Sequence, residues 1–285
     1  MDGLLEWYAR NRRDLPWRAA GTSPWGVLVS EVMLAQTPVS RVVPVWADWM
    51  VRWPTPGTLA ADSPGTVIRA WGRLGYPRRA LRLHEAATLI ERDHAGDVPT
   101  TYAELISLPG IGDYTAAAVL AFAYRRRAVV LDTNVRRVLA RYARGEMLAG
   151  PSVSAAERRL ADSLLPVDPP TAAIWSVAVM ELGALVCTAA APQCDVCPVA
   201  SDCSWRALGK PAHSGPPRRA QRFTGTDRQV RGLLLGVLRE APGPVVKAEL
   251  DHAWPVPDQR ERALDSLLAD GLVQIGPDDH YQLPG

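Results

Sequence analysis

The stretch Leu108-Pro-Gly-Ile-Gly-Asp-Tyr-Thr-Ala-Ala-Ala-Val119 constrains the fold of this chain more than any other segment. Gly110 and Gly112 flank one apolar residue after Leu-Pro, which predicts a backbone hairpin, and a helix of small residues follows at once. Free backbone amides at the start of such a helix can hold a phosphate. Taken alone, the two glycines are weak evidence, because a helix C-cap and a turn would also explain them. The neighbouring segments decide between these interpretations.

Length and charge indicate two or three folded units, one of which meets a polyanion. The chain has 285 residues, 47% of them hydrophobic, which is enough for one sizeable core and a smaller one. Residues 1–222 contain 26 Lys and Arg against 20 Asp and Glu, whereas residues 223–285 contain 6 against 10. A polyanion would therefore dock on the front of the chain. Lys210 and Lys247 are the only lysines, and this preference for arginine fits phosphate contact or a compositional bias equally well.

The four cysteines fall in one short window, as Cys187, Cys194, Cys197 and Cys203. The sequence shows no signal peptide and no apolar run near the length of a membrane span, so we expect a cytoplasmic protein. A reducing compartment disfavours disulfides. The spacing therefore predicts a metal or iron–sulfur site.

Hydrophobic periodicity predicts that the chain before residue 223 is all-α. Helices are expected at 2–13, 24–36, 40–52, 58–72, from 78 onward, 101–107, 113–124, 133–144, 154–165 and 171–187, with a turn at 55–58. Residues 206–222 are rich in Pro, Gly, Ser and Arg and indicate a linker. Beyond it, helices at 227–240, about 246–253 and 258–270 precede short strands at 272–275 and 280–283. This order is that of a small winged helix.

Two carboxylates are candidates for chemistry. Glu31 lies among Leu28, Val32 and Leu34 in its helix, and this apolar setting would raise its pKa toward the value that a general acid needs. It could equally be a glutamate at the edge of an apolar stripe. Asp132 follows a short apolar run and leads the next helix, where it could be only the N-cap.

Two turns carry aromatic residues. Leu15-Pro-Trp-Arg18 breaks the first helix, and Trp17 and Arg18 could present a ring face and a donor to a base, or could pack as core and surface. Leu74-Gly-Tyr-Pro77 exposes Tyr76 amid arginines. That tyrosine suits insertion into a stacked duplex, but it could also be a packed loop residue.

Several segments, taken in order, carry a resemblance to a known family. They are Leu15-Pro-Trp-Arg18, Ser30-Glu-Val-Met-Leu-Ala-Gln-Thr-Pro-Val39, Leu74-Gly-Tyr76, Leu108-Pro-Gly-Ile-Gly-Asp-Tyr-Thr115, Leu131-Asp-Thr-Asn-Val135 and Glu181-Leu-Gly-Ala-Leu-Val-Cys187. Over about residues 4–205 the chain resembles the MutY family of adenine DNA glycosylases, in the endonuclease III superfamily of helix-hairpin-helix enzymes. We therefore expect an all-α helix-hairpin-helix glycosylase domain of two helical lobes at 1–205, with an iron–sulfur loop at 187–203. The linker at 206–222 and a small α+β, winged-helix-like domain at 223–285 complete the expected organisation.

The resemblance implies a monofunctional adenine DNA glycosylase of base excision repair, which hydrolyses the N-glycosidic bond of a flipped adenine mispaired with 8-oxoguanine or guanine. It makes Glu31 the acid that protonates adenine and Asp132 the carboxylate that faces the sugar. Such a pair is needed because adenine leaves poorly until it is protonated, and its departure leaves positive charge on C1′. Tyr114 stands where bifunctional relatives place a lysine that attacks C1′. Since no lysine precedes Lys210, a Schiff base from the catalytic domain is not expected.

The remaining site residues are also implied by the resemblance. Gln36 and Tyr76 would insert into the duplex, and the amides from Gly110 to Gly112 would grip a phosphate. Trp17 and Arg18 would line the adenine pocket, and Asn134 would bind substrate beside Asp132. The cysteines at 187, 194, 197 and 203 would hold a [4Fe–4S] cluster that braces a loop against DNA. The expected partner is double-stranded DNA with an A:8-oxoguanine or A:G mismatch, and we expect a monomer that binds no membrane.

The chain departs from the family pattern at a few positions. Ala35 replaces the usual glutamine, Pro77 stands where a second tyrosine is frequent, and Val177 replaces the amide or carboxylate of the adenine pocket wall. The tail at 223–285 is too short for the usual Nudix-like domain. Two alternatives follow: a mismatch thymine glycosylase of the same superfamily, or a DNA-binding iron–sulfur regulator in which the pair of carboxylates is accidental.

Overall fold

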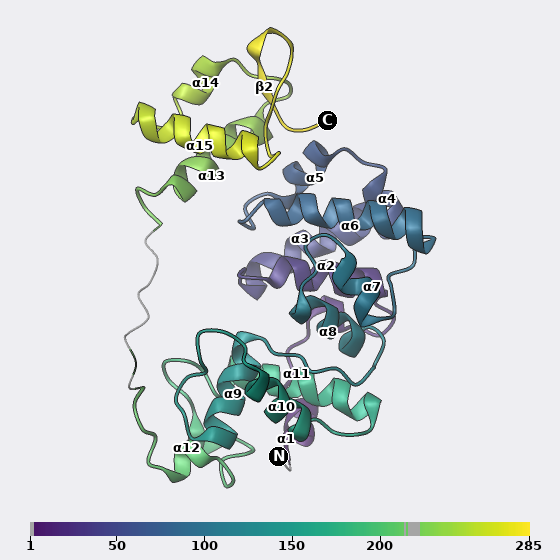
Figure 1. The fold of residues 1–285 in the computed structure, drawn as a ribbon, viewed down its shortest axis with the longest axis vertical. Helices are drawn as coiled ribbons and strands as arrows, with labels where there is room; N and C mark the ends of the chain where they lie inside the picture. The colour runs from purple at the N-terminus through teal and green to yellow at the C-terminus, as the bar shows by residue number, and fades with distance from the viewer. Residues whose placement is uncertain (1–2, 214, 216–222) are drawn as a thin grey trace. The chain divides into compact units, whose positions relative to one another are not determined.

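The computed structural model describes residues 3–213, 215 and 223–285, and the chain is mostly helical (Figure 1). It divides into two units. Unit 1 contains residues 1–28, 100–106 and 111–217, and unit 2 contains residues 29–99, 107–110 and 218–285. No helix in the described part of the chain is long and apolar enough to cross a bilayer.

Unit 1 is built around the packing of α9 on α11. Its helices are α1 (Leu4–Asn11), α7 (Tyr102–Ser107, whose last residue belongs to unit 2), α8 (Asp113–Phe122), α9 (Thr133–Arg144), α10 (Ala155–Leu164), α11 (Pro169–Leu185) and α12 (Ser204–Ala207). Short 3-10 turns lie at Pro16–Arg18 and Cys194–Val196. The core between α1, α9 and α11 contains Leu4, Val135, Val138, Leu139, Trp175, Val179 and Leu182. This core fixes the direction of α9, and with it the position of the residue that caps α9.

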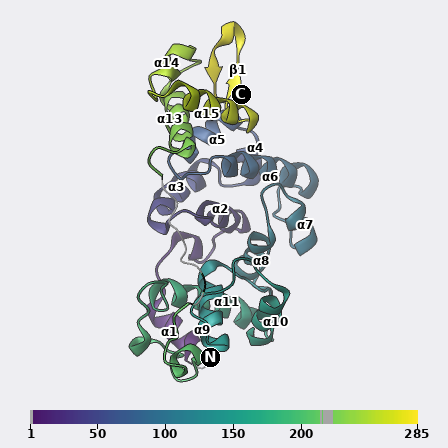
Figure 2. The same cartoon turned by 60° about the vertical axis from the view of Figure 1, so that its left-hand side comes forward.

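Unit 2 begins inside α2 (Pro24–Leu34), which crosses the boundary between the units. It continues with α3 (Val39–Arg52), α4 (Pro56–Ala60), α5 (Pro64–Trp71) and α6 (Arg78–His94), the last of which packs across α4 and α5 (Figures 1 and 2). The indole of Trp49 meets those of Trp53 and Trp71 edge to face, with ring centroids 4.7 and 5.5 Å apart. These buried indoles join α3 to α5.

The expected turn at 55–58 and single helix at 58–72 are wrong. The Thr55 side chain accepts a hydrogen bond from the Thr58 amide and starts α4, with Pro56 at its first position. The Ser63 side chain caps α5 in the same way, with Pro64 at its first position. Two caps in close succession therefore divide the segment into two short helices.

The tail has the element order expected from its sequence. It contains α13 (Asp227–Glu240), α14 (Lys247–Asp251) and α15 (Pro257–Ala269), followed by an antiparallel hairpin of β1 (Gln274–Ile275) and β2 (Tyr281–Gln282) (Figure 2). Both strands are shorter than expected. The tail core includes Val230, Leu234, Leu264 and Leu267, and Ile68 of α5 is part of the same cluster. The predicted all-α front and small α+β tail are confirmed, and residues 214 and 216–222 of the expected linker lie outside the described residues.

Candidate functional site

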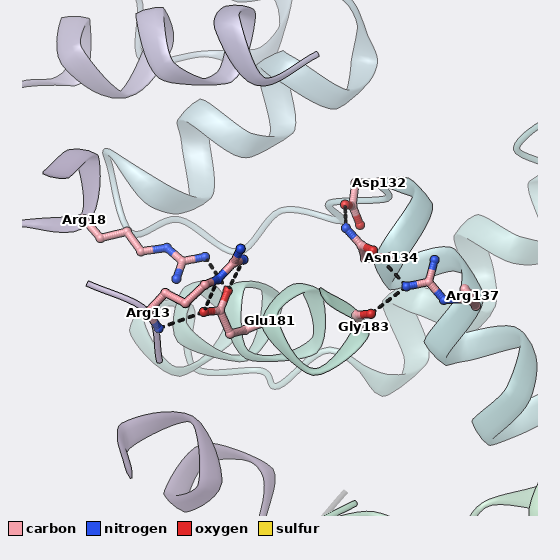
Figure 3. A network of polar contacts seen from close by, with 7 residues as sticks. All are labelled: Arg13, Arg18, Asp132, Asn134, Arg137, Glu181 and Gly183. Carbon is pink, nitrogen blue, oxygen red and sulfur yellow. Dashed lines mark hydrogen bonds and ion pairs between the residues drawn. The ribbon is translucent and has the colours of Figure 1, made fainter. Parts of the chain in front are cut away.

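Asp132 is held by two hydrogen bonds at the start of α9. Its Oδ1 accepts from the Val135 amide at 2.6 Å, as an N-cap does. Its Oδ2 accepts from the Asn134 side-chain amide at 2.8 Å (Figure 3). Arg137 donates to the Asn134 side-chain oxygen at 2.8 Å and to the Gly183 carbonyl at 2.6 Å. The carboxylate therefore has one fixed orientation, which α9 and α11 support together.

Burial raises the pKa of Asp132 above its ordinary value of 3.8. The hydrogen bonds from Val135 and Asn134 and the charge of Arg137 oppose this change but do not outweigh it. A carboxylate that served only as a helix cap would have the lowest desolvation cost at an exposed position, where Asp168 lies at the start of α11. The partly buried position of Asp132 and its raised pKa favour a role in chemistry beyond capping.

A second network surrounds Glu181, the single charged residue of α11 (Figure 3). Its fully buried carboxylate accepts hydrogen bonds from Arg13 at 2.8 and 2.7 Å and from Arg18 at 3.0 Å. Burial would raise the pKa of Glu181, but the two arginines outweigh it and lower this pKa to about 2. Glu181 is therefore ionised at neutral pH and orients both guanidinium groups.

The sequence analysis missed Glu181 and Arg13 as site residues. The available signal was one carboxylate in an otherwise apolar helix, since a buried charge needs a partner. Its partners are 168 and 163 residues away in the sequence, so periodicity could not reveal them. Arg18, which the sequence did single out, keeps one buried donor: its Nη1 has no hydrogen-bond partner among the described residues.

Glu31 lies in the second half of α2, in unit 2, with only 5% of its surface exposed. Leu28 and Val32 beside it are also buried. Glu31 is thus buried together with two of the three apolar residues named from the sequence, while Leu34 is partly exposed. Trp17, on the turn at Pro16–Arg18, is buried as well, and Val177 packs partly buried against the core of unit 1.

Gln36 and Tyr76 are both exposed, and both have a left-handed backbone, with φ of 64° and 49°. Such a conformation is uncommon for residues other than glycine and clusters at functional sites. Arg79 holds the two turns together: it donates to the carbonyl oxygens of Val32 and Gly75 at 2.7 and 3.0 Å. Burial lowers the pKa of Arg79 to about 10, which leaves it charged at neutral pH. The two side chains expected to enter a duplex therefore lie on turns of unit 2 that the hydrogen bonds of Arg79 stabilise.

The hairpin has the conformation expected from its glycines. Gly110 has φ of 78°, and a Cβ atom there would lie 2.7 Å from the Cβ of Arg82, so only glycine fits. Gly112 is the N-cap of α8 and supplies no side chain to the first amides of that helix. Tyr114 follows in the first turn of α8, partly buried against Ala117 and its neighbours.

The four cysteines line one hollow, together with Arg141 and Trp205. The buried Arg141 lies 4.7 Å from the centre of the Trp205 ring and donates to the sulfur of Cys187 at 3.3 Å. Burial raises the pKa of the Cys197 thiol to about 11. Within the residues that the structure describes, no three His, Cys, Asp or Glu side chains are close enough to hold a single metal ion.

Comparison with known proteins gives one consistent family. The pattern of the HhH-GPD superfamily of base excision DNA repair proteins matches residues 29–163. An adenine DNA glycosylase of Mycobacterium tuberculosis is 58% identical over 99% of this chain and 92% of that protein. Among solved structures, a thermostable thymine-DNA glycosylase matches with a TM-score of 0.64 and 26% identity, over 72% of this chain and 94% of that one. An endonuclease III in a non-covalent DNA complex matches with a TM-score of 0.60 and 23% identity, over 73% of this chain and 95% of that one.

Proposed function

The chain belongs to the adenine DNA glycosylases, within the HhH-GPD superfamily of base excision DNA repair proteins, and on that premise we propose that it removes adenine mispaired with 8-oxoguanine or guanine by means of Glu31 and Asp132. One observation carries the assignment of residues. Asp132 is a partly buried carboxylate with a raised pKa, fixed by Val135 and Asn134, whereas a cap needs no burial. Its negative charge would stabilise the positive charge that develops on C1′.

Glu31 has the complementary task. Adenine is a poor leaving group as an anion, and a proton delivered to the ring makes it a neutral one. Glu31 is buried beside Leu28 and Val32, and the protonated form of its carboxyl is the one that can donate. Water then attacks C1′ on the face that the base has left, and the product is an abasic site in an intact strand.

Arg18 supports recognition of the flipped base. Glu181 holds its guanidinium through Nη2, and the buried Nη1 remains able to donate. A ring nitrogen of adenine is an acceptor of the right kind for such a donor. Trp17, next to it, offers an indole for the same pocket. Val177 provides no polar group, so in this chain base selection depends more on Arg18.

Two features support a mismatched DNA duplex as the substrate: the turns of Gln36 and Tyr76 in unit 2, and the hairpin at Gly110 and Gly112. Extrusion of a base leaves a gap in the stack, and the exposed side chains of Tyr76 and Gln36 can fill such a gap. The uncapped amides that follow Gly112 at the start of α8 suit a phosphate. Together they support a duplex with adenine opposite 8-oxoguanine or guanine as the substrate.

The absence of an amine at position 114 gives a testable consequence. Without a lysine before Lys210, the domain cannot form a Schiff base with C1′, so the product strand should stay intact until it is heated or treated with alkali. Borohydride trapping on a mismatch duplex measures this directly, with a bifunctional endonuclease III-type enzyme as the positive control. We expect no covalent complex above background. Efficient trapping of this protein would mean that a different nucleophile acts.

We further propose that Cys187, Cys194, Cys197 and Cys203 hold a [4Fe–4S] cluster. Four thiol donors around one hollow suit a group that takes four thiolate ligands. Arg141 beside Cys187 adds positive charge next to thiolate ligands. When bound, such a cluster supplies structural support to the loop at 187–203 and takes no part in the hydrolysis.

The cluster proposal predicts a brown protein that contains iron and acid-labile sulfide in equal amounts. Cys194→Ser should lose most of the colour and the iron, and it should lose DNA binding before it loses helical structure, because the loop depends on the ligand while α8 and α9 have their own core. Metal analysis, visible absorbance and far-UV circular dichroism measure these effects. Ser201→Ala, in the same loop, is the matched control and should change none of them. A colourless, zinc-loaded and fully active native protein would contradict the proposal.

A further inference from the structure

The tail is joined to α5 and α6 by contacts on both sides of the Tyr76 turn. On the α5 side, Ile68 is fully buried in the tail core, and the Gly65 amide donates to the Pro284 carbonyl at 2.7 Å. On the α6 side, Arg78 forms an ion pair with Asp270 at 3.3 Å. Since α5 and α6 flank the turn, these contacts fix the tail relative to Tyr76.

The Tyr76 turn has a rigid backbone and an exposed ring. The carbonyl of Gly75 accepts hydrogen bonds from the indole of Trp71 and from Arg79, both at 3.0 Å. The Tyr76 side chain nevertheless remains 37% exposed. A side chain that enters a base stack requires a backbone held in place and a ring that solvent can reach.

Arg228, in the first turn of α13, lies on this ring. Its guanidinium carbon is 4.4 Å from the centre of the Tyr76 ring and 5.8 Å from that of Phe223. Of the five other Lys and Arg residues of the tail, four form ion pairs with carboxylates, namely Arg231, Lys247, Arg260 and Arg262, and the fifth, Arg239, is partly buried. Arg228 forms no ion pair with any residue that the structure describes, and its side chain is exposed. Arg228 is therefore an exposed tail cation without a described ion pair that lies on the Tyr76 ring, although the net charge of the tail is negative.

We propose that Arg228 is a DNA-backbone contact supplied by the tail: it covers the Tyr76 ring in the free protein and transfers to a phosphate when the ring enters the duplex. This inference rests on the proposed insertion of Tyr76. A ring between stacked bases needs both faces for the bases, so the guanidinium has to leave. The phosphates that flank the inserted ring are the acceptors nearest to the released cation, and arginine binds phosphate with two parallel donors. The tail then adds one phosphate contact once its guanidinium is released from the ring.

Equilibrium binding tests the transfer. The probe is a duplex with 8-oxoguanine opposite 2′-fluoro-2′-deoxyadenosine, because fluorine destabilises the oxocarbenium-like transition state and keeps the base attached. Dissociation constants are measured over a range of salt concentrations. Arg228→Ala should weaken binding and reduce the magnitude of the salt slope by about one, as expected for the loss of one phosphate contact. Arg228→Lys should keep the slope, and Arg262→Ala, the charge-matched control in the tail, should leave it unchanged.

A double-mutant cycle with Tyr76→Leu tests the covering of the ring. In the native background, Arg228→Ala removes the phosphate contact, which weakens DNA binding, and also removes the contact with the Tyr76 ring in the free protein, which favours binding. In the Tyr76→Leu background there is no ring to cover, so only the loss of the phosphate contact affects binding. The same substitution should therefore weaken binding about two- to five-fold more in the Tyr76→Leu background, the size of an exposed cation–π contact. An unchanged salt slope, or strictly additive effects, would overturn the inference. If Tyr76→Leu alone bound the lesion duplex as the native protein does, the proposed insertion of Tyr76 would fail instead.

Discussion

Glu31→Gln should reduce the single-turnover rate of adenine release by about 10²–10⁴-fold, the usual contribution of a general acid. The amide keeps the shape of the side chain in the buried second half of α2 but has no proton to give. Duplex binding should remain nearly unchanged, because Glu31 is expected to contact only the base. Rates at saturating enzyme and a gel-shift or anisotropy titration measure the two effects separately.

The control for this substitution is Glu85→Gln. Glu85 is an exposed glutamate of α6, paired with Arg82 at 2.7 Å, and lies in the same unit as Glu31. Its loss should leave the rate of excision unchanged. A Glu31→Gln protein that released adenine at the native rate would show that another group donates the proton.

Asp132→Asn should reduce the rate by about 10²–10³-fold, since it removes the negative charge that faces C1′ while the side chain still caps α9. Its free energy of unfolding at neutral pH should stay within about 1 kcal/mol of the native value. The variant no longer buries an ionised carboxylate, and this gain offsets the one hydrogen bond lost to Asn134. Inactivity without destabilisation is the expected signature.

The pH dependence of stability provides an independent measurement on Asp132. Its pKa is raised in the folded protein, so the cost of burying the ionised form is complete above that folded pKa and disappears as the pH falls below the ordinary value of 3.8. The native protein should therefore gain stability relative to Asp132→Asn as the solution is acidified through this range, as measured by denaturant unfolding. Asp168→Asn is the matched control. Asp168 caps α11 at an exposed position, and hydrogen bonds from Thr171 lower its pKa. Because Asp168 is not one of the proposed site residues, the activity of Asp168→Asn should equal that of the native protein.

Local signals allowed most of the helices to be predicted. Asp132 before α9 and Gly110 in the hairpin act through hydrogen bonds and backbone angles within a few residues, so the sequence shows them directly. The wrong assignment at 58–72 arose because Ser63 and Pro64 start a new helix inside an apolar pattern that continues through both. In that segment the cap at Ser63 determines where one helix ends and the next begins, and hydrophobic periodicity does not show this boundary.

The site could be predicted less completely, for a physical reason. Asp132 and Asn134 are two residues apart in the sequence, and the structure joins them by a hydrogen bond. Glu181 meets Arg13 and Arg18 only because α11 packs next to the beginning of the chain. The contact of Arg228 with Tyr76 similarly depends on how the tail docks on α5 and α6. Contacts of this kind follow from tertiary packing, which a single sequence does not display.

The most direct test of the account is single-turnover excision across a panel of mismatches, with enzyme in excess over duplex. The thymine-DNA glycosylase found among similar solved structures makes base choice the critical point, and Val177 lacks the polar group that would help to enforce it. We predict release of adenine opposite 8-oxoguanine and opposite guanine, and no release of thymine from a T:G pair. Release of thymine from T:G without release of adenine from either duplex would contradict the account.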